Sequence, residues 1–386
     1  MNKKVVVVGS GLAGSILARK MAEEKNADVF VIEKRNHIAG NVYDQLDTHG
    51  IRVQRYGPHT FHTSKDNVRK FIMHYTELIP YKLRCQVNIE GMLTTSPFNF
   101  HTIDQLYGEQ EARKLKELLL HTYPDKLAYI LDLLKSNDLK IRDFAQVLYN
   151  KDYRLYTAKQ WGIDPEKIDP SILRRVPVIL DETDTYFRDR YEGIPKDGFT
   201  QFIASLLNHK NICVQLNQDA IPYISFDHKR KKILFKEKEM LVIFTGEVDR
   251  LFRYEFGMLP YRSLEFEYQY LRQRSYQDAA IVAYPGKEPY TRITEYTKLP
   301  YQQVGEQTII SLEYPYPYDR QGEKGTEPYY PVLTEESKKM YQNYVELAKD
   351  YKNLILCGRL ADFSYYNMDQ VIERALQVAD QITTEL

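Results

Sequence analysis

Apolar and small residues at the start of the chain follow a strand–turn–helix–strand pattern. Lys4–Val8 consists of a lysine and four valines and leads into three spaced glycines, Gly9, Gly11 and Gly14. Asp28–Ile32 is a second apolar run, and Glu33 follows it, 19 residues after Gly14. A glycine turn that opens a helix presents unpaired N–H groups to phosphate. The pattern predicts a dinucleotide-binding βαβ unit with Glu33 at the ribose hydroxyls, although a tight turn without a ligand would share the motif.

The apolar spacing becomes helical between residues 64 and 162. We expect Ser64 to cap a helix whose apolar positions run from Val68 to Tyr75. Further helical patterns cover about 108–123, 125–136 and 141–150, and strand signals between them are few. This part of the chain is therefore predicted to be a mostly helical insertion.

From about residue 211 short strand patterns recur at regular spacing, which predicts antiparallel sheet. Two apolar runs, Met240–Phe244 and Leu354–Cys357, each precede a glycine-containing turn and read as strands that return to the dinucleotide domain. A final amphipathic helix is expected from about residue 368.

The predicted fold class is α/β with α+β insertions: a Rossmann-like dinucleotide-binding domain, a helical bundle and a twisted antiparallel sheet. The dinucleotide domain is expected to be discontinuous. The predicted boundaries are 1–63, about 205–250 and 353–386 for the dinucleotide domain, 64–162 for the helical insertion, and 163–204 with 251–352 for the sheet and substrate domain.

Composition narrows the class of function. The net charge is zero, which argues against a nucleic-acid partner, and no apolar run approaches about 18 residues, so no membrane span is predicted. The strand at the N-terminus leaves no room for a signal peptide, and the 3 cysteines are scattered, so we expect a cytoplasmic protein without a metal site. The 32 tyrosines beside one tryptophan suit either ordinary packing or a pocket for sugars and bases.

Nine local motifs, in order along the chain, resemble those of the prokaryotic UDP-galactopyranose mutases. They are EKRNHIAGN (33–41), YGPHTFHT (56–63), YTAKQWG (156–162), GIPKDGFTQFI (193–203), FTGEVDRLF (244–252), YRSLEFE (261–267), PYTRITE (289–295), EPYYPV (327–332) and GRLADFSYYNMDQVI (358–372). The resemblance implies an FAD enzyme that interconverts UDP-galactopyranose and UDP-galactofuranose without net oxidation. It also implies that the enzyme is a homodimer and that its product supplies galactofuranose for surface polysaccharides.

The sequence departs from the family pattern at four positions. Ala39 replaces the first glycine of a Gly-Gly pair, and Glu247 replaces a proline; both changes are expected to adjust turns. Ile179 replaces an arginine and Asn367 an aspartate, and both lie in or beside the expected site. These two leave open altered kinetics or a variant sugar.

The resemblance also implies the roles of individual residues. Arg175 and Arg292 would hold the departing diphosphate, for which the planar guanidinium fork is suited, and His62 would lie on the sugar side. Tyr156 would stack on the uracil, with Trp161 near the sugar nucleotide. The implied substrate residues further include Asn99, Tyr186, Tyr330 and Tyr365. The implied cofactor residues, beside the three glycines and Glu33, are Lys34, Asn41, His59, Arg359 and Met368.

Moving a sugar between ring sizes requires a nucleophile at the anomeric carbon. No cysteine or Ser/His/Asp set stands out for this role, whereas N5 of reduced FAD is nucleophilic. The cofactor is therefore expected to act in its reduced form. Two alternatives remain open: an FAD oxidoreductase that oxidises its substrate, and a noncatalytic sugar-nucleotide-binding protein.

Overall fold

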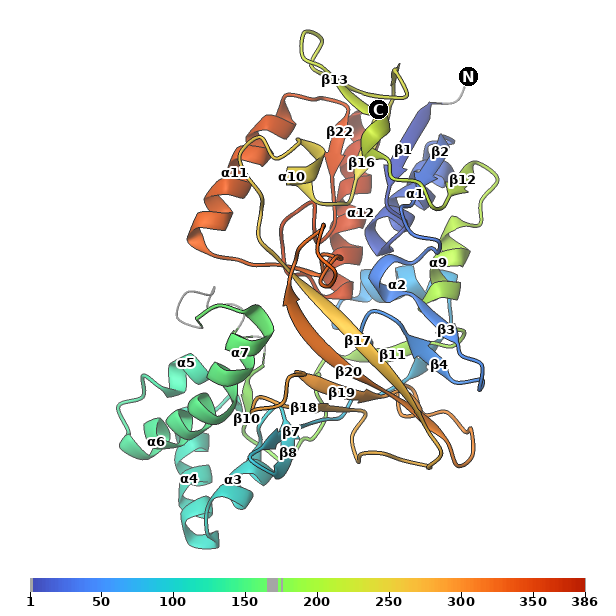
Figure 1. Cartoon of the computed structure of the whole chain (residues 1–386). Coiled ribbons are helices and arrows are strands. Elements are labelled where there is room, and N and C mark those ends of the chain that lie inside the picture. Colours follow the sequence, from blue (N-terminus) through green and yellow to red (C-terminus); the bar gives the residue numbers. More distant parts are fainter. Residues whose placement is uncertain (1–2, 165–172, 175, 386) are drawn as a thin grey trace.

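The computed structural model describes residues 3–164, 173–174 and 176–385. Figure 1 shows a parallel sheet with its helices in one part of the molecule, a helical part at the opposite end, and two long strands, β17 (Tyr261–Leu271) and β20 (Thr308–Pro317), between them. Arg175 lies outside the described residues, so its predicted role stays a prediction.

Five parallel strands form the centre of the dinucleotide domain. Their order is β12-β2-β1-β16-β22, with bounds β1 (Lys4–Val8), β2 (Asp28–Ile32), β12 (Ile212–Gln215), β16 (Leu241–Phe244) and β22 (Leu354–Leu356). Val5 and Val7 on β1 are buried in one core, whereas Val6 between them belongs to the core on the other face. Because successive strand residues point to opposite faces, the sheet must be covered on both.

Helices supply both covers. The face of Val5 and Val7 packs against α1 (Leu12–Glu24), α9 (Phe199–Leu207) and α12 (Met368–Glu385). The face of Val6 packs against α10 (Val248–Leu251), α11 (Glu335–Lys349) and a small sheet of β13 (Ile224–Asp227), β14 (Lys232–Phe235) and β15 (Lys238–Glu239). The carboxyl end of β1 therefore opens at the edge of a sandwich, where ligands of such sheets bind.

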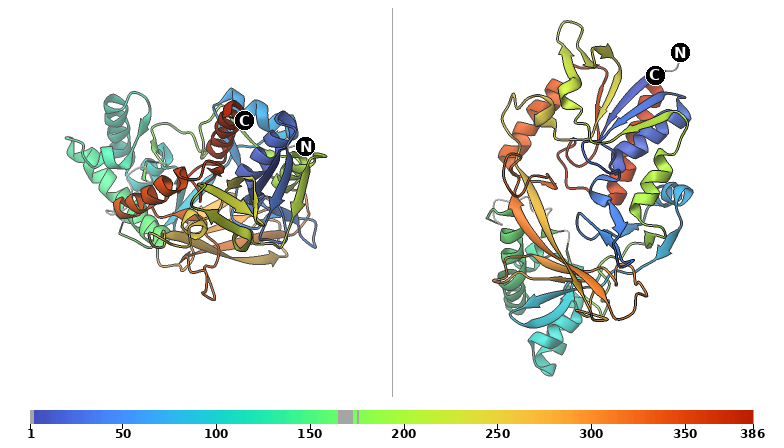
Figure 2. Two further views of the ribbon diagram at one scale, coloured as in Figure 1. Left: turned by 90° about the horizontal axis from the view of Figure 1, so that it is seen from above. Right: turned by 45° about the vertical axis from the view of Figure 1, so that its right-hand side comes forward.

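A seven-stranded sheet connects this domain to the helical part. Its order is β21-β17-β20-β19-β18-β7-β8, with β7 (Cys85–Ile89), β8 (Met92–Ser96), β18 (Ile281–Ala283), β19 (Arg292–Glu295) and β21 (Tyr330–Pro331). β17 and β20 pair over ten positions, from Arg262 opposite Pro317 to Leu271 opposite Thr308. Figure 2 shows these two strands spanning the molecule with a strong twist.

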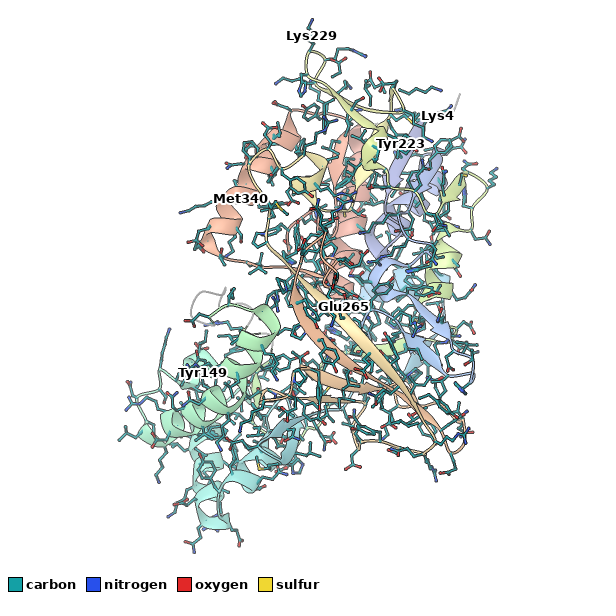
Figure 3. All side chains as sticks on the ribbon, in the orientation of Figure 1. Lys4, Tyr149, Tyr223, Lys229, Glu265 and Met340 are labelled. Carbon is teal, nitrogen blue, oxygen red and sulfur yellow. The ribbon has the colours of Figure 1, made fainter. Side chains whose placement is uncertain are left out.

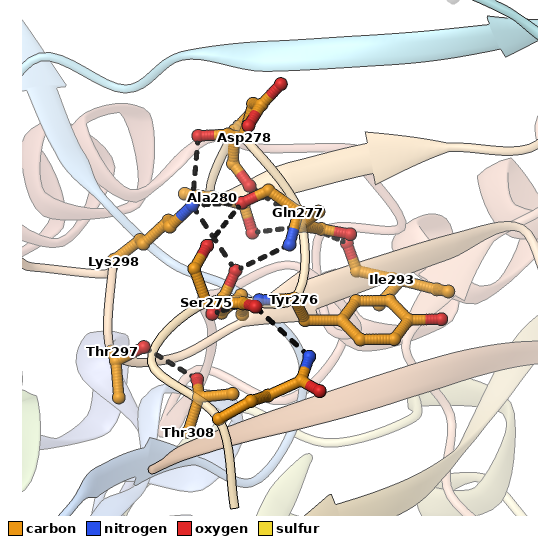
Figure 4. Close-up of polar contacts among 12 residues, drawn as sticks. Ser275, Tyr276, Gln277, Asp278, Ala280, Ile293, Thr297, Lys298 and Thr308 are labelled. Carbon is orange, nitrogen blue, oxygen red and sulfur yellow. Dashed lines mark hydrogen bonds and ion pairs between the residues drawn. The ribbon is translucent and has the colours of Figure 1, made fainter. Parts of the chain in front are cut away.

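The loop between β17 and β18 fixes the position of β19. The Gln277 amide donates to the carbonyl oxygens of Ala280 (3.2 Å) and Ile293 (3.1 Å), and the Lys298 ammonium donates to that of Asp278 (3.2 Å), as Figure 4 shows. Because Ile293 directly follows Arg292, these bonds fix the backbone that presents the Arg292 side chain.

The helical part has a core of its own, which includes Leu119, Phe144 and Leu148. Its helices are α3 (Phe100–Leu106), α4 (Glu109–Thr122), α5 (Ile130–Leu133), α6 (Leu139–Leu148), the π-turn η2 (Tyr149–Tyr153) and α7 (Arg154–Trp161). Tyr149, labelled in Figure 3, marks the start of the π-turn. The remaining elements within the described residues are β3 (Asp44–Leu46), β4 (Arg52–Gln54), β5 (Phe61–Thr63), α2 (Asp66–Tyr75), β6 (Leu78–Pro80), β9 (Leu127–Ala128), β10 (Val178–Ile179) and β11 (Tyr191–Pro195), with short 3-10 turns at Gly40–Val42 and Ile221–Tyr223.

Several predicted elements are confirmed, among them the first βαβ unit, the two returning strands and the last helix. Three details differ. Lys65, not Ser64, is the N-cap residue of α2, because the Ser64 hydroxyl instead donates to Asp189 (2.7 Å). The helix predicted over 125–136 shrinks to the four residues of α5. β12 pairs in parallel with β2 in the dinucleotide domain and is not part of the antiparallel sheet.

The segment boundaries also differ from those predicted. Residues 78–96, expected in the helical insertion, form β6, β7 and β8, and the last two extend the large sheet. These strands are short, so the alternation of apolar and polar residues along them gives only a weak periodic signal in the sequence. The dinucleotide domain takes in α9 from residue 199 rather than about 205, since α9 packs its apolar face on the same core as α1.

Candidate active site

The turn after β1 leaves no room for a side chain at Gly9 or Gly14. Gly9 has φ of 101°, and a Cβ on Gly14 would lie 2.1 Å from the carbonyl oxygen of Gly9. A Cβ on Gly40 would lie 2.9 Å from Cα of Gly11. At these glycines no side chain covers the backbone, which lines a pocket at the carboxyl ends of β1 and β16. A pyrophosphate needs such close access to backbone N–H groups.

Glu33 both faces this pocket and holds the glycine turn. Its side chain is 5% exposed, and one carboxylate oxygen accepts from the backbone N–H and the hydroxyl of Ser10, each at 2.8 Å. The other oxygen accepts from the backbone N–H of Arg35 at 3.0 Å. The oxygen that accepts from Arg35 has a further lone pair, so Glu33 can also accept from a ribose hydroxyl.

Replacing Glu33 should therefore have two effects. We expect Glu33→Ala to weaken retention of bound dinucleotide by about 1–3 kcal/mol, because charged hydrogen bonds are lost, and to lower the melting temperature, because Ser10 loses its acceptor. Glu33→Gln should keep part of both. Retention is measured by equilibrium dialysis, with the exposed α1 variant Glu23→Ala as the control; equal retention in Glu33→Ala and this control would contradict the assignment.

A partly buried ion-pair cluster borders the same pocket from the side of β21. Glu327 pairs with Lys34 (3.0 Å) and Arg35 (2.9 Å), and Arg35 also donates to the Asn41 side-chain oxygen (3.0 Å). Burial opposes the charge of Arg35, yet Glu327 raises the pKa of the guanidinium above its ordinary value. Lys34 and Asn41 thus lie in the pocket lining where they were expected.

A second cavity, of about 630 Å³, lies between the helical part and the large sheet. His59, Arg359 and Met368 line both this cavity and the dinucleotide pocket. The two spaces therefore meet at these three side chains. A group that extends from a dinucleotide toward them would face whatever occupies the second cavity.

Arg292 places a positive charge in the second cavity. It lies on β19 directly opposite Glu313 on β20, and its Nε and Nη2 atoms lie 2.7 Å and 2.6 Å from one Glu313 oxygen. Burial alone would lower the pKa of Arg292, but Glu313 keeps it well above the usual value. Because the pair uses only part of the guanidinium, an N–H edge is left for an anion.

Aromatic rings surround this charge. The rings of Tyr330 and Tyr365 meet edge to face at 5.0 Å, and Trp161 lies 5.3 Å from Tyr365, also edge to face. Burial raises the pKa of Tyr330 to about 12 and raises that of Tyr156 further. These phenols therefore stay protonated near pH 7 and can donate hydrogen bonds to an anion.

His59 is held as a neutral ring between the two spaces. Its Nδ1 lies 2.8 Å from the carbonyl oxygen of Gly57, which can only accept, so Nδ1 carries the proton and Nε2 is an acceptor. Burial, with the nearby charges of Arg359 and Arg292, lowers the pKa of His59 to about 4. His59 should thus present an uncharged acceptor throughout the neutral range.

This pKa predicts a contribution to acid stability. The unfolded chain takes up the His59 proton near pH 6.5, whereas the folded chain resists it until about pH 4. Stability should therefore be lost as pH falls through this window, by at most about 3 kcal/mol. Urea unfolding at pH 7 and pH 4.5 checks this: His59→Gln should lose less stability than wild type, whereas the exposed-histidine control His121→Gln should follow wild type. A loss as steep in His59→Gln as in wild type would contradict the prediction.

His62 is oriented by two residues that the sequence motifs did not single out. The ring of Phe187 stacks on it at 3.6 Å, and Asp189 lies 2.7 Å from Nδ1. The carboxylate fixes the Nδ1–H tautomer, so Nε2 is free to face the cavity, which His62 lines. Phe187 and Asp189 follow Tyr186 closely in sequence, but only the pairing of β11 with β5 brings this segment to His62.

The structure gathers most of the predicted site residues into these two spaces. Those that line the dinucleotide pocket are Gly9, Gly11, Gly14, Glu33, Lys34, Asn41, His59, Arg359 and Met368, and those that line the second cavity include His62, Tyr156, Trp161, Tyr186, Arg292, Tyr330 and Tyr365. Asn99 is not among them. It is fully buried as the N-cap of α3, where its side chain accepts from His101 N–H and donates to the carbonyl of Thr183. Its amide is thus used within the fold.

Comparison with known proteins agrees with this geometry. A family model for UDP-galactopyranose mutase matches residues 151–365, and one for an NAD(P)-binding Rossmann-like domain matches residues 7–75. The chain belongs to the UDP-galactopyranose mutase family. It is 35% identical to the dTDP-fucopyranose mutase of Escherichia coli, with 97% of each chain covered, and 32% identical to a probable UDP-galactopyranose mutase of Klebsiella pneumoniae, with 100% of this chain and 96% of the relative covered.

A crystal structure of reduced UDP-galactopyranose mutase has the same fold, with a TM-score of 0.74 at 14% identity, covering 100% of this chain and 96% of that one. A putative protoporphyrinogen oxidase from Exiguobacterium also aligns, with a TM-score of 0.68 at 14% identity and full coverage of both chains. Through its family the protein is a mutase, an enzyme of the isomerase class. None of the helices described above combines the length and apolarity needed to cross a bilayer.

The departures of this mutase from the family motifs have visible positions. Ala39 has φ of 77°, a left-handed conformation that glycine adopts more easily. Glu247 lines the dinucleotide pocket and accepts from the Tyr318 hydroxyl at 2.9 Å. Ile179 and Asn367 both line the second cavity, so these two changes alter its wall directly.

Proposed function

We propose that this mutase binds FAD and interconverts UDP-galactopyranose and UDP-galactofuranose with no net oxidation. The observation that carries the proposal is the junction of the two spaces at His59, Arg359 and Met368, with the Arg292 cation in the second. A dinucleotide in the first space would bring its reactive end to the sugar end of a nucleotide sugar in the second. Family membership supports this arrangement.

The first space suits FAD. The bare turn from Gly9 to Gly14 accommodates a pyrophosphate, and the buried carboxylate of Glu33 accepts from a ribose. His59, Arg359 and Met368 would surround the flavin ring at the junction. Bound in its reduced form, FAD supplies a nucleophile for the anomeric carbon.

The residues of the second cavity would bind and orient the substrate. Arg292 would hold the diphosphate as it leaves and keep it close for return, which makes the return effectively intramolecular. Tyr330 and Tyr365 would donate hydroxyl hydrogen bonds to the same phosphates. Tyr156 would stack on the base, and the neutral His59 Nε2 would accept a hydrogen bond without adding charge.

The 35% identical E. coli relative supports a second candidate substrate, dTDP-fucose. Thymine and uracil present the same imide edge, so the second cavity can take either base. The two sugars differ in the hydroxyl at C6. Asn367 and Ile179, which line the cavity and depart from the family pattern, are candidate determinants of this difference.

The experiment that tests the proposal is incubation of the dithionite-reduced protein with each furanose, followed by chromatography for the pyranose. Conversion of UDP-galactofuranose supports the first proposal, and faster conversion of dTDP-fucofuranose supports the second. Conversion of neither, with nucleotide sugar still bound, would support a noncatalytic binding role. A homodimer and use of the product in surface polysaccharides complete the proposal and rest on the motif resemblance. A cytoplasmic location is also part of the proposal and rests on the scattered cysteines.

A further inference from the structure

The π-turn η2 directs a carboxyl group at the substrate cavity. η2 runs directly into α7, and side chains lining the cavity recur along this segment at 152–153, 156–157 and 160–161. This spacing is one face of a continuous helix. Asp152 therefore lies one turn before Tyr156 on the same face. π-turns of this kind shift side-chain register and are frequent at functional sites.

Asp152 has no task within the described part of the fold. It makes no hydrogen bond or ion pair with any described residue, whereas the neighbouring Tyr153 hydroxyl donates to the carbonyl of Val176 (2.9 Å). Burial raises the pKa of Asp152 to about 7, and no charged neighbour among the described residues contributes to this shift. A partly buried carboxyl without a partner is costly unless a ligand satisfies it.

The other charged side chains that line the same cavity each have a partner among the described residues, and Arg359 donates to the Tyr366 carbonyl oxygen (2.7 Å). Arg188 pairs with Asp181 (2.8 Å), Asp189 with His62 (2.7 Å) and Arg292 with Glu313 (2.6 Å). Tyr153 and Tyr156 follow Asp152 in sequence and line the same cavity. Burial raises the pKa of both phenols, so they stay neutral. The protonation of Asp152 is thus governed by its burial and by the ligand.

We propose that Asp152 reads the nucleobase, pairing as a neutral carboxyl with the imide edge of a uracil or thymine ring stacked on Tyr156. A neutral carboxyl offers one O–H donor and one carbonyl acceptor side by side. The imide edge offers the matching pair, a carbonyl beside the N3–H. An ionised carboxylate would keep the N3–H bond but face the carbonyl with a negative charge. This inference rests on the proposed function, which places a pyrimidine nucleotide in this cavity.

The test uses binding of UDP to the air-oxidised enzyme, measured by calorimetry between pH 6.5 and 8. Asn presents the same donor and acceptor as a neutral carboxyl but does not titrate, so Asp152→Asn should bind UDP as tightly as wild type does at pH 6.5. Asp152→Ala should bind about tenfold more weakly, since two neutral hydrogen bonds are lost. The exposed helical-part variant Asp143→Asn is the matched control and should behave as wild type.

The pH profile separates base reading from a structural role. The ratio of wild-type to Asp152→Asn affinity cancels titration of the UDP phosphate, and it should fall about fivefold from pH 6.5 to pH 8 as Asp152 ionises. A constant ratio, or an Asp152→Ala variant that binds UDP as wild type does, would overturn this inference while leaving the proposed function intact. If wild type fails to bind UDP at all, the proposed function falls and the inference with it.

Discussion

Activity on UDP-galactofuranose should appear only when the enzyme is reduced under exclusion of oxygen. Substrate and product are isomers, so no electrons leave in the balance, yet the anomeric carbon needs a nucleophile. Cys85 is the one thiol among the described residues that line the second cavity, and burial raises its pKa to about 12. It therefore stays a poorly nucleophilic thiol near pH 7. The nucleophile is then expected from the reduced cofactor.

The measurement is chromatography of substrate and product before and after dithionite treatment, with NADH oxidation followed in parallel. Many turnovers per reduction are expected, with no stoichiometric use of reductant. Cys85→Ala should keep the same dependence on reduction, which separates cofactor from thiol. Equal activity in the oxidised enzyme, or one NADH consumed for each product molecule, would contradict the mechanism.

Removing the Arg292 guanidinium should lower turnover by about 100- to 1000-fold. A positioned charge that stabilises a developing anion contributes about 3–4 kcal/mol to the transition state. Arg292→Lys should recover little, because an ammonium lacks the fork that binds Glu313 and phosphate together. Turnover of the reduced enzyme on UDP-galactofuranose measures the effect. Arg174→Ala, which breaks an exposed pair with Asp132, is the control and should have a small effect.

The Glu313 contact adds a stability cost that must be separated from catalysis. Glu313 is 1% exposed, so Arg292→Ala leaves a buried carboxylate without its cation, at a cost of about 3–5 kcal/mol. The double variant Arg292→Met/Glu313→Gln should recover much of this stability and none of the turnover. If the double variant regains activity, or if Arg174→Ala and Arg292→Ala lose activity equally, Arg292 does not hold the diphosphate. From the motif resemblance, Arg175→Ala should cause a loss similar to that of Arg292→Ala.

The local part of the site could be predicted from the sequence, because glycine spacing and the apolar runs act over short distances. Gly9, Gly14 and Glu33 lie where the βαβ pattern places them. Residue pairs that are brought together only by strand pairing could not be predicted from the sequence. Arg292 meets Glu313 only through the register of β19 with β20, although a glutamate within the apolar run of β20 was a signal that such a partner was needed.

The same limit explains the errors. The family resemblance implied a substrate role for Asn99, but an asparagine before a helix is equally suited to capping, and Asn99 caps α3 in the structure. The sequence pattern assigns residues 78–96 to the helical insertion because the strands in this segment are short. Two of them pair with β11 and β18, which are distant in sequence. Sequence periodicity reports how a segment is buried but not which segment buries it.

The strand order of the parallel sheet has a kinetic consequence. β1 lies between β2, which follows it closely, and β16, which begins at residue 241, while the edge strand β22 begins at residue 354. Closing such long loops loses chain entropy before the strands gain their contacts, so assembly of this sheet should be slow. The helical part, whose core forms largely from residues 87–180, has far shorter loops to close. During synthesis the helical part should therefore fold before the parallel sheet. That sheet, which carries the dinucleotide pocket, is complete only when β22 has been synthesised.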